Sequence, residues 1–128
     1  MTAAVVLTPV SAPVADHVAE HVLVVALEGA LDYTNAERLR RDVEAALGEE
    51  HRELVLDLSG LNFCDSTGIR ILLSVRKLMQ ERHGAVTLAG LNARLARIFR
   101  VTGLISAFTV APGLAEAVEA VGARSTPR

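Results

Sequence analysis

The sequence predicts a single α/β domain with a mixed, mostly parallel sheet of four to five strands, packed with about four helices. Short apolar runs rich in β-branched residues alternate with helical patterns of ten to sixteen residues, which is typical of strands joined by right-handed crossovers. The length, 128 residues, is near that of one domain. Hydrophobic residues make up 51% of the chain and aromatic ones only 3%, so aliphatic side chains must fill the core.

The chain divides into three parts. We expect residues 1–21 to form an N-terminal segment, residues 22–122 the domain itself, and residues 123–128 a flexible tail. Within the first part, residues 5–7 fit a short edge strand, because the prolines that follow lack the backbone donors of a central strand.

The first strand and helix of the domain have clear signals. The apolar run 22–27 predicts a strand covered on both faces, with Gly29 at its end. A helix is predicted over about 35–48. Its start matches a capping box, in which the side chains of Thr34 and Glu37 pair with the first free N–H groups.

A second strand and helix follow in the same order. Residues 54–58 predict the strand and residues 59–62 a polar turn. The second helix is predicted from Ser66 to about residue 82, and Gly84 then favours a stop.

The remaining elements complete the alternation. Residues 86–89 predict a third strand, and Asn92 is expected to cap a third helix that ends before Gly103. A further strand is predicted at 105–110. Pro112 suits the first turn of a last helix.

Composition argues against several classes of function. A formal net charge of -2 gives no positive field for nucleic acid or an anionic membrane, and no apolar run is long enough to span a bilayer. Cys64, the single cysteine, excludes an internal disulfide and a multi-cysteine zinc site. His17 and His21 lack the metalloprotease pattern. No signal peptide is recognisable, so we expect a cytoplasmic protein. We also expect it to hold no metal and no cofactor.

The second helix has two apolar faces. The face expected to pack on the sheet carries Ile71, Leu72, Val75, Leu78 and Met79. Ile69 and Leu73 fall on the opposite face, together with Arg76 and Gln80. Either a neighbouring helix or the N-terminal segment covers the two aliphatic side chains, or they form a patch where a partner docks.

Two interpretations are open for Ser66. It is a good helix cap, which accepts hydrogen bonds from the first N–H groups. Alternatively it is a phosphorylation site: three oxygen-bearing residues, Asp65, Ser66 and Thr67, stand in a row, and Gly68 removes side-chain bulk beside them. A phosphoryl group adds about -1.5 to -2 charges, which a helix N-terminus accommodates but a docking partner does not.

Four stretches of the chain carry a resemblance to a known family. They read LVLDLS at 54–59, FCDSTGI at 63–69, GALD at 29–32 and LARIFRVTGL at 95–104. Together they resemble the STAS domain, and specifically the bacterial anti-sigma factor antagonists. The match covers roughly residues 22–110.

The resemblance implies a switch between partners rather than an enzyme. In that family the unphosphorylated antagonist binds an anti-sigma factor and so frees a sigma factor for transcription. The anti-sigma factor is often a serine kinase that phosphorylates the antagonist, and a phosphatase reverses the mark. Ser66 would be the phospho-acceptor, with Thr67 a less favoured second site. The expected partner-binding residues are Asp32, Asp65, Gly68, Ile69, Leu73 and Arg76.

Alternatives remain for the function and for two local features. The chain also fits a STAS interaction module in another signalling complex. A hydrolase with Ser66 as nucleophile needs a nearby base, but His51 and His83 are predicted at the opposite edge of the sheet. Cys64 is expected to be a small buried hydrophobe rather than a redox-sensitive thiol. A row of arginines is expected to be a solvated face or to steer an acidic partner: Arg94, Arg97 and Arg100.

Overall fold

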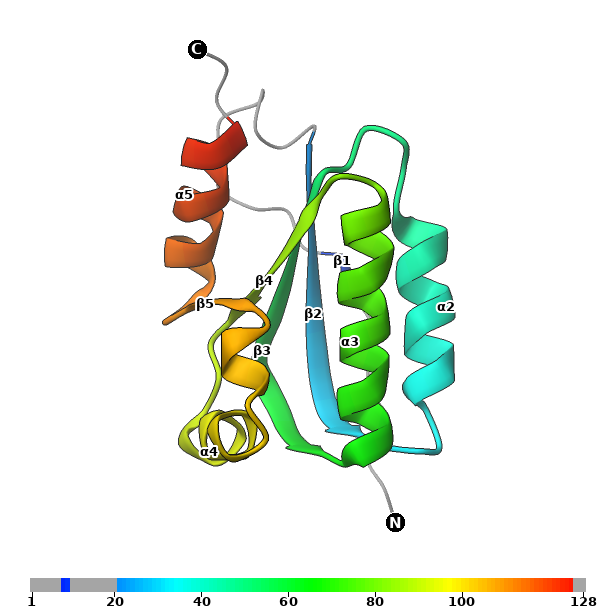
Figure 1. Cartoon of the computed structure of the whole chain (residues 1–128), viewed down its shortest axis with the longest axis vertical. Coiled ribbons are helices and arrows are strands. Elements are labelled where there is room, and N and C mark those ends of the chain that lie inside the picture. Colours follow the sequence, from blue (N-terminus) through cyan, green and yellow to red (C-terminus); the bar gives the residue numbers. More distant parts are fainter. Residues whose placement is uncertain (1–7, 10–20, 126–128) are drawn as a thin grey trace.

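The protein folds into one five-stranded sheet with helices on both faces (Figure 1). The computed structural model describes residues 8–9 and 21–125. The strands lie in the order β1-β2-β3-β4-β5. In chain order the elements are β1 (Thr8–Pro9), β2 (Val22–Leu31), α2 (Ala36–Ala46), β3 (Glu53–Cys64), α3 (Ser66–Glu81), β4 (Ala85–Ala89), α4 (Ala93–Val101), the 3₁₀ helix η1 (Leu104–Ser106), β5 (Thr109–Ala111) and α5 (Leu114–Ser125).

The sheet is mixed and mostly parallel, as the sequence predicts. Strands β2 to β5 are parallel to one another, and β1 pairs with β2 in the antiparallel sense at the edge. Pro9 within β1 fits this edge position, because an edge strand has one side without ladder bonds. The strand expected at residues 5–7 lies outside the described residues.

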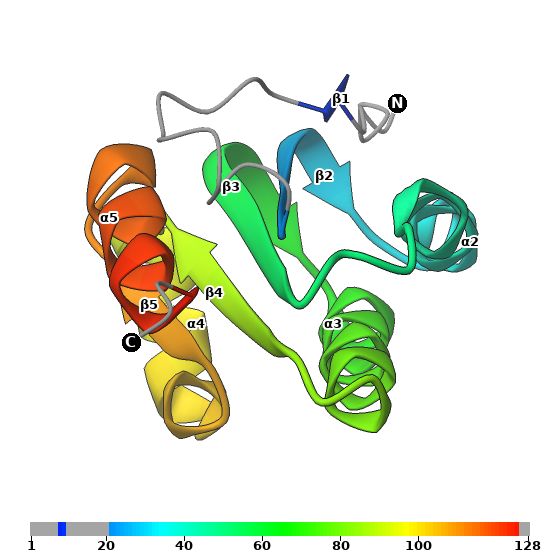
Figure 2. The same ribbon diagram turned by 90° about the horizontal axis from the view of Figure 1, so that it is seen from above.

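Two hydrophobic layers hold the helices to the sheet. The larger layer joins one face of the sheet to α2, α3 and α4, and the smaller joins the other face to α5, which lies across the sheet from α2 and α3 (Figure 2). Full burial of one such aliphatic side chain contributes about 1.5–3 kcal/mol. Fully buried members of the larger layer include Leu27, Leu56, Leu58, Val75 and Phe99, and those of the smaller include Val55, Ala117 and Val121.

Strands β2 and β3 run further than predicted. Gly29 does not end β2, and residues 59–62 form no turn, because both segments stay paired up to Leu31 and Cys64. The pairing register shifts twice, between Ala26 and Glu28 and again between Gly29 and Ala30. Both shifts place an extra residue in β3: residues 57–60 lie opposite 26–28, and residues 61–63 lie opposite 29–30. β3 therefore contains two β-bulges, which bend the strands without ending them. The bulges carry both strands to the edge where α2 and α3 begin.

The C-terminal part differs from the prediction in three respects. The strand expected at 105–110 begins with η1 instead, and β5 covers only Thr109–Ala111. Leu104 and Phe108 are buried but Ser106 between them is exposed, which breaks the alternation of a strand and fits a helical turn. Pro112 lies before α5, not in its first turn. The helix continues to Ser125, three residues past the expected boundary, and 126–128 are outside the described residues.

Candidate functional site

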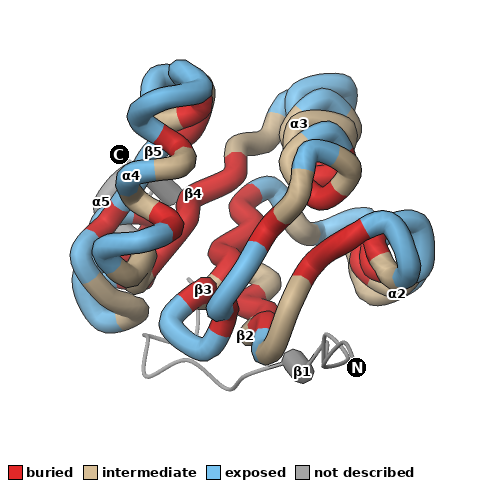
Figure 3. Tube along the Cα trace, turned by 90° about the horizontal axis from the view of Figure 1, so that it is seen from below, coloured by how far each residue is buried: buried red, intermediate tan, exposed pale blue. Residues whose placement is uncertain are grey.

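The ends of β2 and β3 and the start of α3 lie together at the carboxyl edge of the sheet (Figures 1 and 3). Ser66 is the first residue of α3. Its side chain is exposed, and within the described part of the chain its hydroxyl has no hydrogen-bond partner. The cap of α3 is Asp65, whose Oδ1 accepts a hydrogen bond from the Gly68 N–H at 2.8 Å. The interpretation of Ser66 as the cap is therefore wrong, and its hydroxyl takes no part in holding the helix.

Asp65 also joins α3 to the loop that follows β2. Its second oxygen, Oδ2, accepts a hydrogen bond from the Tyr33 N–H at 3.0 Å. Its own N–H donates to the Leu31 carbonyl at 3.1 Å. One carboxylate thus fixes the loops after both strands, so the backbone on either side of Ser66 is held in place.

The capping box predicted for α2 is not formed. The Thr34 N–H and hydroxyl both donate to Oδ1 of Asp32, with the N–H at 2.9 Å. Asn35 occupies the N-cap position of α2 and makes no side-chain cap bond. Its side chain instead accepts from the Asp32 N–H and donates to the Ala30 carbonyl. Asp32 is therefore a buried residue that shapes the loop, and it presents little of itself to a partner.

Gly68 is buried where α3 meets the ends of β2 and β3. A Cβ added at this position would lie 2.8 Å from the Cys64 Sγ, 2.8 Å from the Leu31 carbonyl oxygen and 2.9 Å from the Leu31 Cγ. These separations are too short for any side chain. Gly68 thus lets the first turn of α3 approach the strands closely, and its contacts are with the core.

The outer face of α3 is only half open. Ile69 and Leu73 are partly buried and pack against the larger hydrophobic layer, so neighbouring elements cover their inner sides. Arg76 is half-buried and lines a shallow groove with Gln80 beside β4 and β5. It lies ten residues from Ser66, about 15 Å along the helix axis. Ile69 and Leu73 are therefore the members of this face that lie within two turns of Ser66.

The structure reveals two aromatic side chains that the motif alone does not mark as exposed. Tyr33 is 77% exposed and Phe63 is 45% exposed. Tyr33 is tied to Asp65 through its N–H, and Phe63 precedes Cys64 at the end of β3. Aromatic side chains are enriched in protein interfaces, so two exposed ones near the candidate site favour a docking surface there. The available sequence signal was that Tyr33 directly follows the segment 29–32 and that Phe63 begins the segment 63–69.

Cys64 is buried beneath the site. Burial, and to a lesser degree the neighbouring Asp65 charge, raises the pKa of its thiol to about 12 from 9.0. Because the thiolate is the reactive form, we expect the folded protein to react with a disulfide reagent at pH 8 at least about 100-fold more slowly than the unfolded chain. Reaction rates with and without urea test this. Equal rates would show that the thiol is accessible and acidic.

The raised pKa also has a consequence for stability. The unfolded thiol ionises near pH 9 and the folded one only near 12. Because the unfolded state releases its proton first, the free energy of unfolding should fall as the pH rises from about 9 towards 12.

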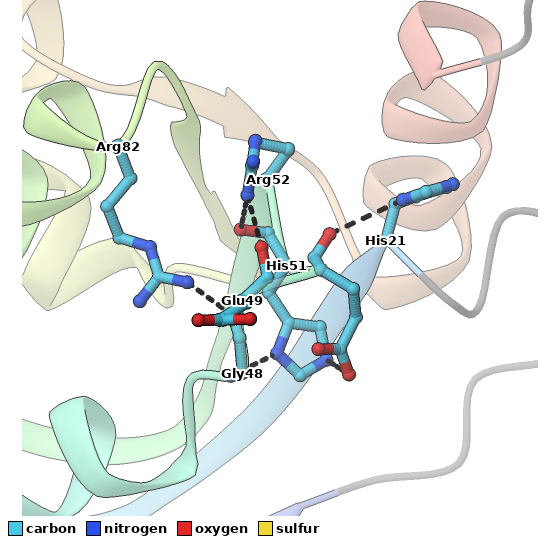
Figure 4. Close-up of polar contacts among 7 residues, drawn as sticks. His21, Gly48, Glu49, His51, Arg52 and Arg82 are labelled. Carbon is cyan, nitrogen blue, oxygen red and sulfur yellow. Dashed lines mark hydrogen bonds and ion pairs between the residues drawn. The ribbon is translucent and has the colours of Figure 1, made fainter.

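His51 and His83 lie at the opposite edge of the sheet from Ser66, as predicted. His51 precedes β3, whose length separates it from Ser66 by roughly 30 Å, and His83 follows the sixteen-residue α3. The Nδ1 of His51 accepts a hydrogen bond from the Gly48 N–H at 2.8 Å, and Arg82 donates to the Gly48 carbonyl (Figure 4). These side chains fix the turn before β3 and cannot serve Ser66 as a base.

The structure gives no support for two other kinds of site. Among the described residues there is no group of three metal-binding side chains, and His17 lies outside them. None of the described helices combines the length and apolar character needed to cross a membrane. The three arginines of α4 are exposed, and within the described part of the chain they form no ion pairs.

Comparison with known proteins identifies the family. The STAS domain model matches residues 12–117. BtrV of Bordetella bronchiseptica, a proposed anti-sigma factor antagonist, is 33% identical over 70% of this chain and 77% of its own length. A crystal structure of an anti-sigma factor antagonist from Mycobacterium paratuberculosis is 24% identical, with a TM-score of 0.77 over 94% of this chain and 98% of that one. A structure of the phosphorylated form of SpoIIAA from Bacillus is 22% identical, with a TM-score of 0.64 over 92% of this chain and 99% of that one. This chain belongs to the STAS domain family and falls among its anti-sigma factor antagonists.

Proposed function

We propose that this protein is an anti-sigma factor antagonist controlled by phosphorylation at Ser66. The unphosphorylated form binds an anti-sigma factor, which releases a sigma factor for transcription in the cytoplasm. The observation that carries the proposal is the exposed Ser66 hydroxyl at the start of α3, left unengaged because Asp65 provides the cap. The names of the relatives support the same role.

The position of Ser66 suits a switch that acts on binding rather than on folding. A kinase would transfer the γ-phosphoryl group of ATP to Oγ of Ser66, with loss of the hydroxyl proton and release of ADP. The product carries about -1.5 to -2 added charges. The free N–H groups and dipole of the α3 N-terminus stabilise an anion there, so the fold persists. A partner lying over Ser66 would instead have to desolvate that charge.

The docking surface would centre on the residues exposed around Ser66. Tyr33 and Phe63 offer apolar area on the strand-end side, and Ile69 and Leu73 offer it along α3. Asp32, Asp65 and Gly68 would act indirectly, because their contacts hold the two loops and the helix start in place. Thr67 is half-buried, which makes it a poorer kinase substrate than Ser66.

Two measurements test the proposal. Candidate anti-sigma factors should be captured by the unphosphorylated protein, and those with kinase activity should phosphorylate it with ATP and Mg²⁺. Peptide mapping by mass spectrometry should place the phosphate on Ser66, and the Ser66→Ala variant should stay unmodified. Phosphate on neither Ser66 nor Thr67 would argue against the switch. If the protein captured another signalling complex and no anti-sigma factor, it would instead be a STAS interaction module of that complex.

A further inference from the structure

We propose that Arg70 is the intramolecular partner of the phosphoryl group on Ser66, an inference that rests on the proposed function. Phosphorylation would draw the Arg70 guanidinium across the first turn of α3 and pair it with the phosphate. The modification would then change two charges on the docking surface. It would add an anion at Ser66 and withdraw a free cation at Arg70.

Helix geometry brings the two side chains together. Ser66 and Arg70 lie four positions apart on α3, and both are exposed. Residues at this spacing have Cβ atoms about 5–6 Å apart on one face. Side chains in a helix also lean towards its N-terminus, so the long Arg70 side chain is directed over the turn that contains Ser66.

Arg70 has no acidic residue within helical reach in the unphosphorylated protein. The positions three and four residues away on either side are Ser66, Thr67, Leu73 and Ser74. By contrast, Arg38 and Arg40 of α2 pair with carboxylates at these spacings. No ion pair involves Arg70 within the residues that the structure describes. Phosphorylation of Ser66 would supply the missing anion.

The surroundings of Ser66 also require a cation once it is phosphorylated. The Asp65 carboxylate is fixed beside it by hydrogen bonds to the N–H groups of Gly68 and Tyr33, so it cannot turn away from a second anion. The helix dipole offsets part of this repulsion. Arg70 is the cation of α3 nearest to Ser66, since Arg76 lies about 15 Å along the axis. Its planar guanidinium can form two parallel hydrogen bonds with a phosphate.

The test measures how Arg70 affects ionisation of the phosphate. Phosphoserine is placed at position 66 by genetic encoding, and its second pKa is followed by phosphorus NMR in wild type, Arg70→Gln, Arg70→Lys and Lys77→Gln. We expect Arg70→Gln to raise this pKa by about half a pH unit, because it removes the cation that favours the dianion. Arg70→Lys keeps the positive charge, so the second pKa of the phosphoserine should stay close to its wild-type value. About 1 M salt should remove most of the difference between wild type and Arg70→Gln.

Lys77→Gln is the matched control. It removes one positive charge from an exposed position of the same helix, eleven residues or about 16 Å from Ser66, and should leave the pKa at the wild-type value. Equal values for wild type and Arg70→Gln would overturn the inference, as would an equal rise in Lys77→Gln. Because encoded phosphoserine needs neither kinase nor partner, this outcome is independent of whether Ser66 is phosphorylated in the cell.

Discussion

Gly68→Ala is expected to lower the free energy of unfolding by about 2 kcal/mol. Alanine would gain about 0.8–1 kcal/mol in helix propensity. Its Cβ would, however, lie within 3.0 Å of Leu31 and Cys64, where one contact is a backbone oxygen that cannot move independently. The clash outweighs the gain, so the first turn of α3 should be pushed away from the strands. Urea denaturation, followed by circular dichroism, measures the change.

Gly48→Ala provides the matched control. The three atoms nearest to a Cβ there all belong to the carboxylate of Glu50, a flexible side chain that can rotate away. We expect a change within about 0.5 kcal/mol, as at most surface positions. If Gly68→Ala were as stable as this control, the close approach of α3 to Leu31 and Cys64 would not be a constraint on the fold.

Ser66→Asp is expected to weaken binding to the anti-sigma factor on the order of 100-fold, or about 2.7 kcal/mol. The new carboxylate stands where the partner would cover it, so binding must desolvate an unpaired charge. Ser66→Ala should bind within a few-fold of wild type and remain active in the presence of the kinase. Calorimetric titration of both variants against the partner measures the difference.

The stability of these variants separates binding from folding. Since Asp65 caps α3, Ser66→Ala should lose no cap and should unfold within about 0.5 kcal/mol of wild type. Ser74→Asp places the same charge on α3 about 12 Å further along and should affect binding much less. Equal affinities for Ser66→Ala and Ser66→Asp would contradict the switch.

The order of strands and helices could be predicted from the sequence because the spacing of apolar residues differs between helices and strands. The apolar spacing of α3 and the cap at Asn92 are local signals. The structure confirms the cap and the burial of Ile71, Leu72, Val75 and Met79, whereas Leu78 is only half-buried and lies beside α2. The β-bulges could not be predicted this way. Gly29 and Gly60 have the composition of turn residues, and only pairing of β2 with β3 shows that the strands continue.

In the candidate site, too, local features could be predicted from the sequence and features that depend on tertiary contacts could not. The sequence predicts that Ser66 stands at the start of a helix, because local patterns reveal that start, and the structure places it there. The sequence does not decide which of three consecutive oxygen-bearing residues caps α3. In the structure Asp65 is the cap, and its carboxylate also accepts a hydrogen bond from Tyr33, which lies 32 residues earlier and is brought there by the sheet. The exposure of Tyr33 and Phe63 is likewise a product of tertiary packing.

The place of Tyr33 gives the protein an internal optical probe. It is the only tyrosine in a chain without tryptophan, so ultraviolet emission excited near the tyrosine band comes from this one ring. The ring is largely exposed, and its backbone is bonded to the residue that precedes Ser66. A protein that covers this edge would change the emission without any attached dye, and one that docks elsewhere would leave it unaltered.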